Sequence, residues 1–214
     1  MSDAAGVLPH RLRPAAGEPQ GALVLMHGRG TSEDDLFPLL DVLDPRRRLL
    51  GVAPGGPLHL PPGGRHWYAV RRVGHPDPAT FAQGFGALTA FLDGLGLDWS
   101  RTVLGGFSQG SVMAYATGLG EGRPLPAGIV ALSGFVPTVE GWRMRDDVPP
   151  GFPVAIGHGT HDEIISVDFG RAARDRLQAA GADVTYHESP IAHTIDPRFL
   201  GGLPEWVDGV VPPG

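Results

Sequence analysis

The sequence predicts an α/β fold in which helices cover both faces of a mostly parallel central sheet. Short apolar runs of strand length alternate along the chain with longer segments whose apolar residues recur at helical spacing. Several of the short runs are apolar at every position, which is typical of strands buried on both faces of a parallel sheet. With 214 residues, 42% of them hydrophobic, the chain fits a single domain spanning residues 1–214.

The first half of the chain contains two expected strands, each followed by a loop and a helix. The strands are the apolar runs Gly21–Met26 and Leu49–Ala53. Thr31 or Ser32 is expected to cap the first helix, and Asp77, which precedes a proline, is expected to cap the second. The apolar positions at helical spacing are Leu36, Leu39, Leu40 and Leu43 in the first helix, and Phe81, Phe85, Leu88 and Leu92 in the second.

The second half repeats this alternation. Two long connections, 54–76 and 134–150, are rich in glycine and proline or lack periodicity, so we expect them to be irregular. Residues 1–20 are expected to form either an edge strand or a partly flexible segment. The expected strands begin at Thr102 and span 128–133, 153–156 and 184–187, and the expected helices follow Ser108, span 164–180, and lie around 200–207.

The segment Thr102–Ala116, TVLGGFSQGSVMAYA, carries the first candidate for chemistry. It predicts a strand, a tight turn at Gly-Phe-Ser-Gln-Gly, and a helix, which is the setting in which a serine is lifted clear of a sheet edge on a strained turn. Gly106 and Gly110 leave room where strand and helix nearly touch. Because the chain has 33 glycines, the five letters alone are a weak signal, and it is the setting that makes Ser108 the candidate nucleophile.

A serine needs a base to remove its proton and a carboxylate to orient that base. Asp162 follows an expected strand, and His193 lies in a loop late in the chain, which gives the order serine, acid, histidine. Asp162 has an alternative interpretation as a helix N-cap. A metal site built from His158, His161, Asp162 and His193 is a weaker alternative, because neither a helical histidine pair nor a cysteine supports it.

The backbone amides of Arg29 and Gln109 are the candidate donors for the oxyanion that forms on the attacked carbonyl. Arg29 lies in a glycine-rich loop after the first strand, and Gln109 begins the helix that follows the nucleophile. That loop could instead be an ordinary turn or a phosphate cradle, but neither nucleotide-binding glycine pattern is completed there.

These motifs resemble the α/β-hydrolase family of phospholipases and carboxylesterases that includes the acyl-protein thioesterases. The resemblance spans about residues 22–211 and rests on five segments. It implies that Ser108, Asp162 and His193 form a catalytic triad and that the amides of Arg29 and Gln109 form the oxyanion hole. The five segments are LVLMHGRG, GGFSQGSVMA, LSGFVP, HGTHDEIISV and PIAHTIDP.

The sequence therefore predicts a serine carboxylesterase that hydrolyses small to medium esters through an acyl-enzyme on Ser108. An acyl thioesterase or lysophospholipase using the same site, or a non-catalytic binding protein with a hydrolase fold, are the alternatives. Many family members have an aliphatic residue where this chain has Arg29, so the resemblance does not imply a preference for long acyl chains. The expected pocket walls are Trp67, Phe135, Trp142 and Ile164, although Trp67 and Trp142 could equally belong to the core. No helical lid is expected, because too few residues separate 134 from 162.

Composition narrows the possible partners and surroundings. A net charge of −6 disfavours nucleic acid as a partner, and the absence of cysteine excludes disulfides, thiolate metal sites and a cysteine nucleophile. We expect no cofactor and no metal, and a small ester or thioester as the substrate. Residues 1–21 contain no apolar stretch of signal-peptide length, so we expect a cytoplasmic protein without stable membrane insertion. The sequence leaves a homodimer open.

Overall fold

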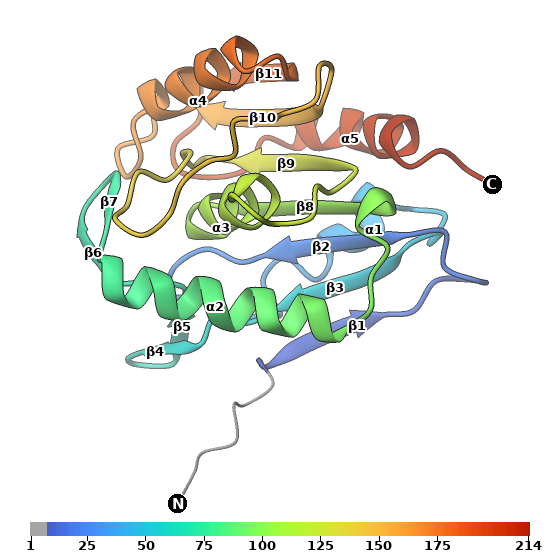
Figure 1. The fold of residues 1–214 in the computed structure, drawn as a ribbon, viewed down its shortest axis with the longest axis horizontal. Coiled ribbons are helices and arrows are strands. Elements are labelled where there is room, and N and C mark those ends of the chain that lie inside the picture. The colour runs from blue at the N-terminus through green and yellow to red at the C-terminus, as the bar shows by residue number, and fades with distance from the viewer. Residues whose placement is uncertain (1–7) are drawn as a thin grey trace, which may run out of the picture.

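A computed structural model describes residues 8–214, and its centre is a seven-stranded sheet (Figure 1). The strand order is β1-β3-β2-β8-β9-β10-β11. Every neighbouring pair is parallel except β1 and β3, so the predicted mostly parallel sheet is confirmed. The strands are β1 (His10–Arg13), β2 (Ala22–Met26), β3 (Leu50–Pro54), β8 (Thr102–Phe107), β9 (Gly128–Leu132), β10 (Pro153–Gly159) and β11 (Asp183–Ser189). Strand β1 is the edge strand expected within residues 1–20, of which residues 1–7 lie outside the described part of the chain.

Helices cover both faces of the sheet, as the sequence predicts, and each face has its own apolar core (Figure 1). Helices α2 (Pro78–Gly94), α3 (Gln109–Leu119) and α4 (Val167–Ala179) pack on one face. Helices α1 (Leu39–Leu43) and α5 (Pro197–Val210) pack on the other. Alternate residues of one strand point into opposite cores: Val24 into the first, Leu23 and Leu25 into the second.

The sequence-based prediction of the first helix is wrong about where the helix begins and which residue caps it. Helix α1 begins only at Leu39 and has no side-chain cap. Thr31 cannot cap it, because the residue is extended: its carbonyl accepts a hydrogen bond from the Arg65 amide at 2.7 Å, and its hydroxyl donates to the carbonyl of Gly28. By contrast, the expected cap at Asp77 is confirmed, since its carboxylate accepts a hydrogen bond from the Thr80 amide at 3.0 Å.

Two further expectations need correction. Residues 54–76 are not irregular, because they contain two short hairpins, β4 (Leu58–Leu60) with β5 (Gly64–His66) and β6 (Val70–Arg72) with β7 (His75–Pro76). Helix α4 begins at Val167 rather than at 164, and Ser166 is its cap. A single turn of 3-10 helix, η1 (Trp99–Arg101), precedes β8.

No helical lid covers the carboxyl end of the sheet. Residues 133–152, which join β9 to β10 and are described in full, contain no helix. Within residues 8–214, none of the helices combines the length and the apolar character that crossing a bilayer requires.

The ends of β2 and β8 meet the start of α3 with no side chain between them. A β-carbon placed on Gly110 would lie 1.8 Å from the carbonyl oxygen of Met26, and one placed on Gly106 would lie 2.3 Å from the carbonyl carbon of Gly110. Real β-carbons do not approach backbone atoms this closely, so any substitution forces α3 away from the sheet.

Gly110→Ala should therefore destabilise the fold by about 3 kcal/mol or more, because the backbone at the end of β2 cannot move aside without breaking the sheet. The free energy of unfolding in urea is the measurement. Gly201→Ala is the matched control: Gly201 also lies in a helix, but a β-carbon there would have no heavy atom within 4 Å, so alanine should leave stability unchanged or raise it by up to about 1 kcal/mol. Equal stability of the two variants would contradict the packing argument.

Candidate active site

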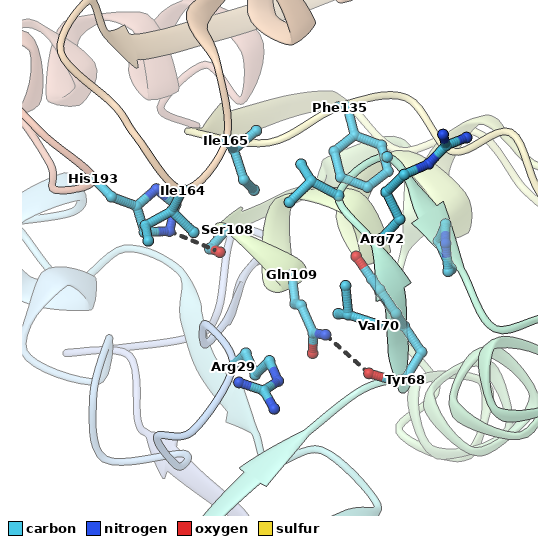
Figure 2. A pocket seen from close by; sticks show the side chains of 13 residues that line it. Arg29, Tyr68, Val70, Arg72, Ser108, Gln109, Phe135, Ile164, Ile165 and His193 are labelled. Atoms are coloured by element: carbon cyan, nitrogen blue, oxygen red, sulfur yellow. Dashed lines mark hydrogen bonds between the residues drawn. The ribbon is translucent and has the colours of Figure 1, made fainter.

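Ser108 occupies the turn between β8 and α3 in a strained backbone conformation, with φ 56° and ψ −119°. Few non-glycine residues adopt this region, and holding one there costs of order 1–3 kcal/mol. The surrounding structure holds it: the Ser108 amide donates to the carbonyl of Leu132 at 2.8 Å, and the Ser108 carbonyl accepts the Ser111 amide at 3.1 Å. The turn places the hydroxyl at the carboxyl end of the sheet (Figure 2).

Two hydrogen bonds link Ser108, His193 and Asp162, which lie far apart in the sequence. His193 Nε2 is 2.9 Å from Ser108 Oγ, and His193 Nδ1 is 2.7 Å from Asp162 Oδ2. The carboxylate can only accept, so Nδ1 carries the proton and Nε2 accepts the serine hydroxyl proton. The three residues follow β8, β11 and β10 respectively, and the parallel sheet brings these strand ends to one edge.

Asp162 is held by two backbone amides of the turn that follows it. Its Oδ1 accepts hydrogen bonds from the amides of Ile164 at 2.9 Å and Ile165 at 2.8 Å, which leaves Oδ2 for His193. These contacts resemble an N-cap, but the interpretation of Asp162 as a helix cap is wrong, because α4 begins only at Val167 and Ser166 caps it. The carboxylate side chain is fully buried and fixed by these three donors.

His158 is a buried histidine beside Asp162 that the sequence suggested only as part of an alternative metal site. Its Nε2 donates to the carbonyl of Ile165 at 2.8 Å, so the imidazole supports the turn that holds Asp162. Burial lowers the pKa of His158 below 6.5, although the hydrogen bond to Ile165 and the charge of Asp162 oppose the shift. The strand pattern could have identified it as inward-facing, but not the carbonyl it binds.

The loop after β2 lies against Ser108, the candidate nucleophile. A β-carbon on Gly28 would lie 3.5 Å from Ser108 Cβ, and Arg29 lines the same cavity as Ser108. Among the backbone and side-chain acceptors of residues 8–214, the Arg29 amide has no partner. The Gln109 amide is the first of helix α3, where amides lack acceptors within the helix. Both expected donors therefore lie at the cavity.

His27 holds this loop in shape. Its Nε2 accepts the amide of Gly56 at 2.9 Å, so Nδ1 carries the proton and donates to the carbonyl of Gly28 at 2.6 Å. Burial lowers the pKa of His27, which favours this neutral form. His27 comes directly after β2, as Ser108 comes after β8, but its side chain contacts this loop and not Ser108, His193 or Asp162.

The Gln109 side chain binds the segment before the hairpin of β6 and β7. Its Oε1 accepts the amide of Trp67 at 3.0 Å, and its Nε2 donates to the carbonyl of Tyr68 at 2.9 Å (Figure 2). Sequence reasoning assigned Gln109 a role only through its backbone. Because both partners lie about forty residues earlier, no local pattern could reveal this bridge.

A cavity of about 270 Å³ opens beside Ser108 and is mostly apolar (Figure 2). Phe135 and Ile164 line it as expected, but Trp67 and Trp142 do not. Trp67 is fully buried beneath the loop and donates to the carbonyl of His27, while Trp142 packs at the far end of α3, where it donates to the carbonyl of Ala116. The lining residues are Arg29, Tyr68, Val70, Arg72, Val73, Gly74, Pro76, Ser108, Gln109, Phe135, Ile164, Ile165 and His193.

The histidine-rich segment after β10 does not form a metal cluster within the described part of the chain, where no three histidine or carboxylate side chains are grouped to hold an ion. His158 and His193 both lie near Asp162, but each is engaged in the hydrogen bonds given above, and His161 is exposed.

The parallel sheet, the strained serine turn and the order serine, acid, histidine define a hydrolase of the α/β-hydrolase superfamily. The chain belongs to the phospholipase/carboxylesterase family, which it matches over residues 11–210. The resemblance noted in the sequence is thereby confirmed.

Relatives and solved structures agree with this assignment. The chain is 30% identical to acyl-protein thioesterase 1 of Yarrowia lipolytica, over 91% of this chain and 94% of the relative. It is 26% identical to acyl-protein thioesterase 1 of Debaryomyces hansenii, over 94% and 96%. Its fold superposes on esterase PE8 with a TM-score of 0.79 and 28% identity, covering 95% and 99%, and on Bacillus cereus carboxylesterase with 0.82 and 24%, covering 95% and 94%.

The lowered pKa of His158 predicts how stability depends on pH. The unfolded chain takes up a proton near pH 6.5 that the folded chain does not, so stability is lost as the pH falls from 6.5 toward the folded pKa, by up to about 1.4 kcal/mol per pH unit. His158→Gln should reduce this loss, measured as the difference between free energies of unfolding in urea at pH 7.5 and 5.5. His161→Gln, at an exposed neighbour, should keep the wild-type difference, and an equal effect of both would contradict the assignment.

Proposed function

We propose that this protein is a serine carboxylesterase that hydrolyses small to medium carboxylic esters through an acyl-enzyme on Ser108. The observation that carries the proposal is the pair of hydrogen bonds from Ser108 Oγ to His193 and from His193 to the buried Asp162. A serine at the start of a helix, with a neutral imidazole accepting its proton and a carboxylate on the far nitrogen, has the parts that acyl transfer requires.

In the first half-reaction, Ser108 Oγ attacks the carbonyl carbon of the ester as its proton passes to His193 Nε2. The imidazolium is stabilised by Asp162, whose charge is fixed by the two amides on Oδ1. Collapse of the tetrahedral intermediate breaks the bond to the leaving alcohol, which takes the proton from His193. The acyl group then remains on Ser108.

The negative charge of the intermediate forms on the carbonyl oxygen, beside the amides of Arg29 and Gln109. Both donors are fixed before the reaction, Arg29 by the loop that His27 holds and Gln109 by the start of α3. In the second half-reaction, water loses a proton to His193 and attacks the acyl-enzyme, which releases the acid and restores the Ser108 hydroxyl.

The size of the cavity supports small to medium acyl groups. Its volume of about 270 Å³ lies just below the range of about 300–1,000 Å³ that is usual for small-molecule sites. The carboxylesterase and esterase names of the structural neighbours favour esters, whereas the acyl-protein thioesterase relatives make thioester hydrolysis the second candidate. A lysophospholipase activity would need the long acyl chain to extend beyond this cavity.

Ser108→Ala should abolish turnover of 4-nitrophenyl butyrate, with kcat reduced by at least about 10³-fold, because the variant removes the nucleophilic oxygen. The melting temperature should not fall, because the variant removes no packing contact. Ser100→Ala is the matched control: Ser100 lies before the amino end of β8, at the opposite edge of the sheet, and should keep wild-type turnover. Measuring esters and thioesters of graded acyl length separates the two candidate activities.

A fluorophosphonate probe distinguishes the enzyme from a non-catalytic binding protein with the same fold. An adduct on Ser108, located by mass spectrometry and absent from Ser108→Ala, is the expected result. Retained turnover in Ser108→Ala, or no adduct in the wild type, would contradict the proposal.

A further inference from the structure

We infer that the acyl side of the pocket recognises a carboxylate, so that the preferred substrates are monoesters or monothioesters of short dicarboxylic acids. This inference rests on the proposed function at Ser108 and adds the class of acyl group. Its basis is a tyrosine whose hydroxyl opens into the cavity, Tyr68, and an arginine without a carboxylate partner at the same wall, Arg72.

Tyr68 is a mostly buried residue of this wall whose hydroxyl stays open to the cavity. The residue is 2% exposed and lines the cavity, and no atom of residues 8–214 accepts or donates a hydrogen bond at its hydroxyl. Burial raises the pKa of Tyr68, so the group stays a protonated donor. Because the hydroxyl opens into the cavity and has no partner among these residues, it is free to donate to an oxygen of a bound substrate.

The charges around the cavity are all positive. Thirteen of the 17 arginines form ion pairs with carboxylates among the described residues, but Arg29 and Arg72, which line the cavity, do not. The lining itself contains no carboxylate, although the chain as a whole carries a net charge of −6. Arg29 and Arg72, both exposed and without a carboxylate partner, are therefore available to an anion.

The carboxylates nearest in sequence do not neutralise this wall. Asp77 follows the β6–β7 hairpin but is bound by Arg71, at 2.6 Å. Asp162 is buried and bound to His193. Glu163 is exposed and does not line the cavity. Arg72 instead donates to the Nε2 atom of His75, a neutral partner within the same hairpin.

The position of His193 indicates that the wall formed by Tyr68 and Arg72 contacts the acyl group and not the leaving alcohol. His193 protonates the leaving alcohol, so the alcohol must lie on its side of Ser108 and the acyl chain on the other. Figure 2 shows His193 on one side of Ser108, and Tyr68, Phe135 and Arg72 together on the opposite side. Apolar Val70 and Phe135 suit a short methylene chain, and Tyr68 and Arg72 suit a carboxylate at its end.

The experiment compares two 4-nitrophenyl esters with the same six-carbon acyl group, 4-nitrophenyl hydrogen adipate and its neutral methyl ester. The wild type should hydrolyse the anionic ester with a kcat/KM roughly tenfold or more above that of the neutral ester. The reason is that charge-assisted hydrogen bonds to the carboxylate are stronger than hydrogen bonds between neutral groups. Arg72→Gln should lower this ratio roughly tenfold and Tyr68→Phe several-fold, while Arg72→Lys should restore part of it.

Arg71→Gln is the matched control, since Arg71 is the next residue, is paired with Asp77 and does not line the cavity; its ratio should stay at the wild-type value. A wild-type ratio near one, or a ratio unchanged in both Arg72→Gln and Tyr68→Phe, would overturn the inference and leave the proposed esterase function intact. Turnover of both esters by Ser108→Ala would instead overturn the proposed function.

Discussion

Direct contact between backbones at the ends of β2, β8 and α3 is the constraint on which the site depends. Gly106 and Gly110 allow α3 to start against the carbonyl of Met26, and this approach leaves Ser108 no ordinary conformation. The strain at Ser108 is thus the consequence of close packing between a strand pair and a helix, and the buried core around them offsets its cost of order 1–3 kcal/mol. The result is a hydroxyl raised above the sheet edge at a helix N-terminus.

The same strand edge supplies every other part of the site, but each part is held by its own partner. The loop carrying Arg29 depends on His27, the turn carrying Asp162 depends on His158, and the wall containing Tyr68 depends on the side chain of Gln109. Two of these three supports are buried neutral histidines. Because the pKa of each histidine is lowered, the conformation of the site depends on pH: protonating either ring would place a charge where its surroundings provide little solvation.

Sequence periodicity and glycine spacing predicted the sheet, the order of its elements and the residues that meet at its edge, because these depend on local pattern and on the geometry of parallel strands. The start of α1 was missed because Thr31 pairs with Arg65, a contact across the chain that outweighs local capping preference. Trp67 and Trp142 were placed in the pocket because they lie in loops near the site. Their burial and hydrogen bonds to distant carbonyls could not be inferred from composition.

The pocket wall shows why specificity is harder to predict than chemistry. Acyl transfer needs a fixed set of groups at fixed positions, so the proposed triad of Ser108, Asp162 and His193 is recognisable from the order of these residues in the chain. Recognition of the acyl group depends on which charges the rest of the protein leaves unpaired. Arg71 and Arg72 are adjacent and chemically identical, yet Asp77 binds the first and the second faces the cavity. The pairing of β6 with β7 is irregular between Val70 and Arg72, so the local register of this hairpin decides which of the two arginines faces the cavity.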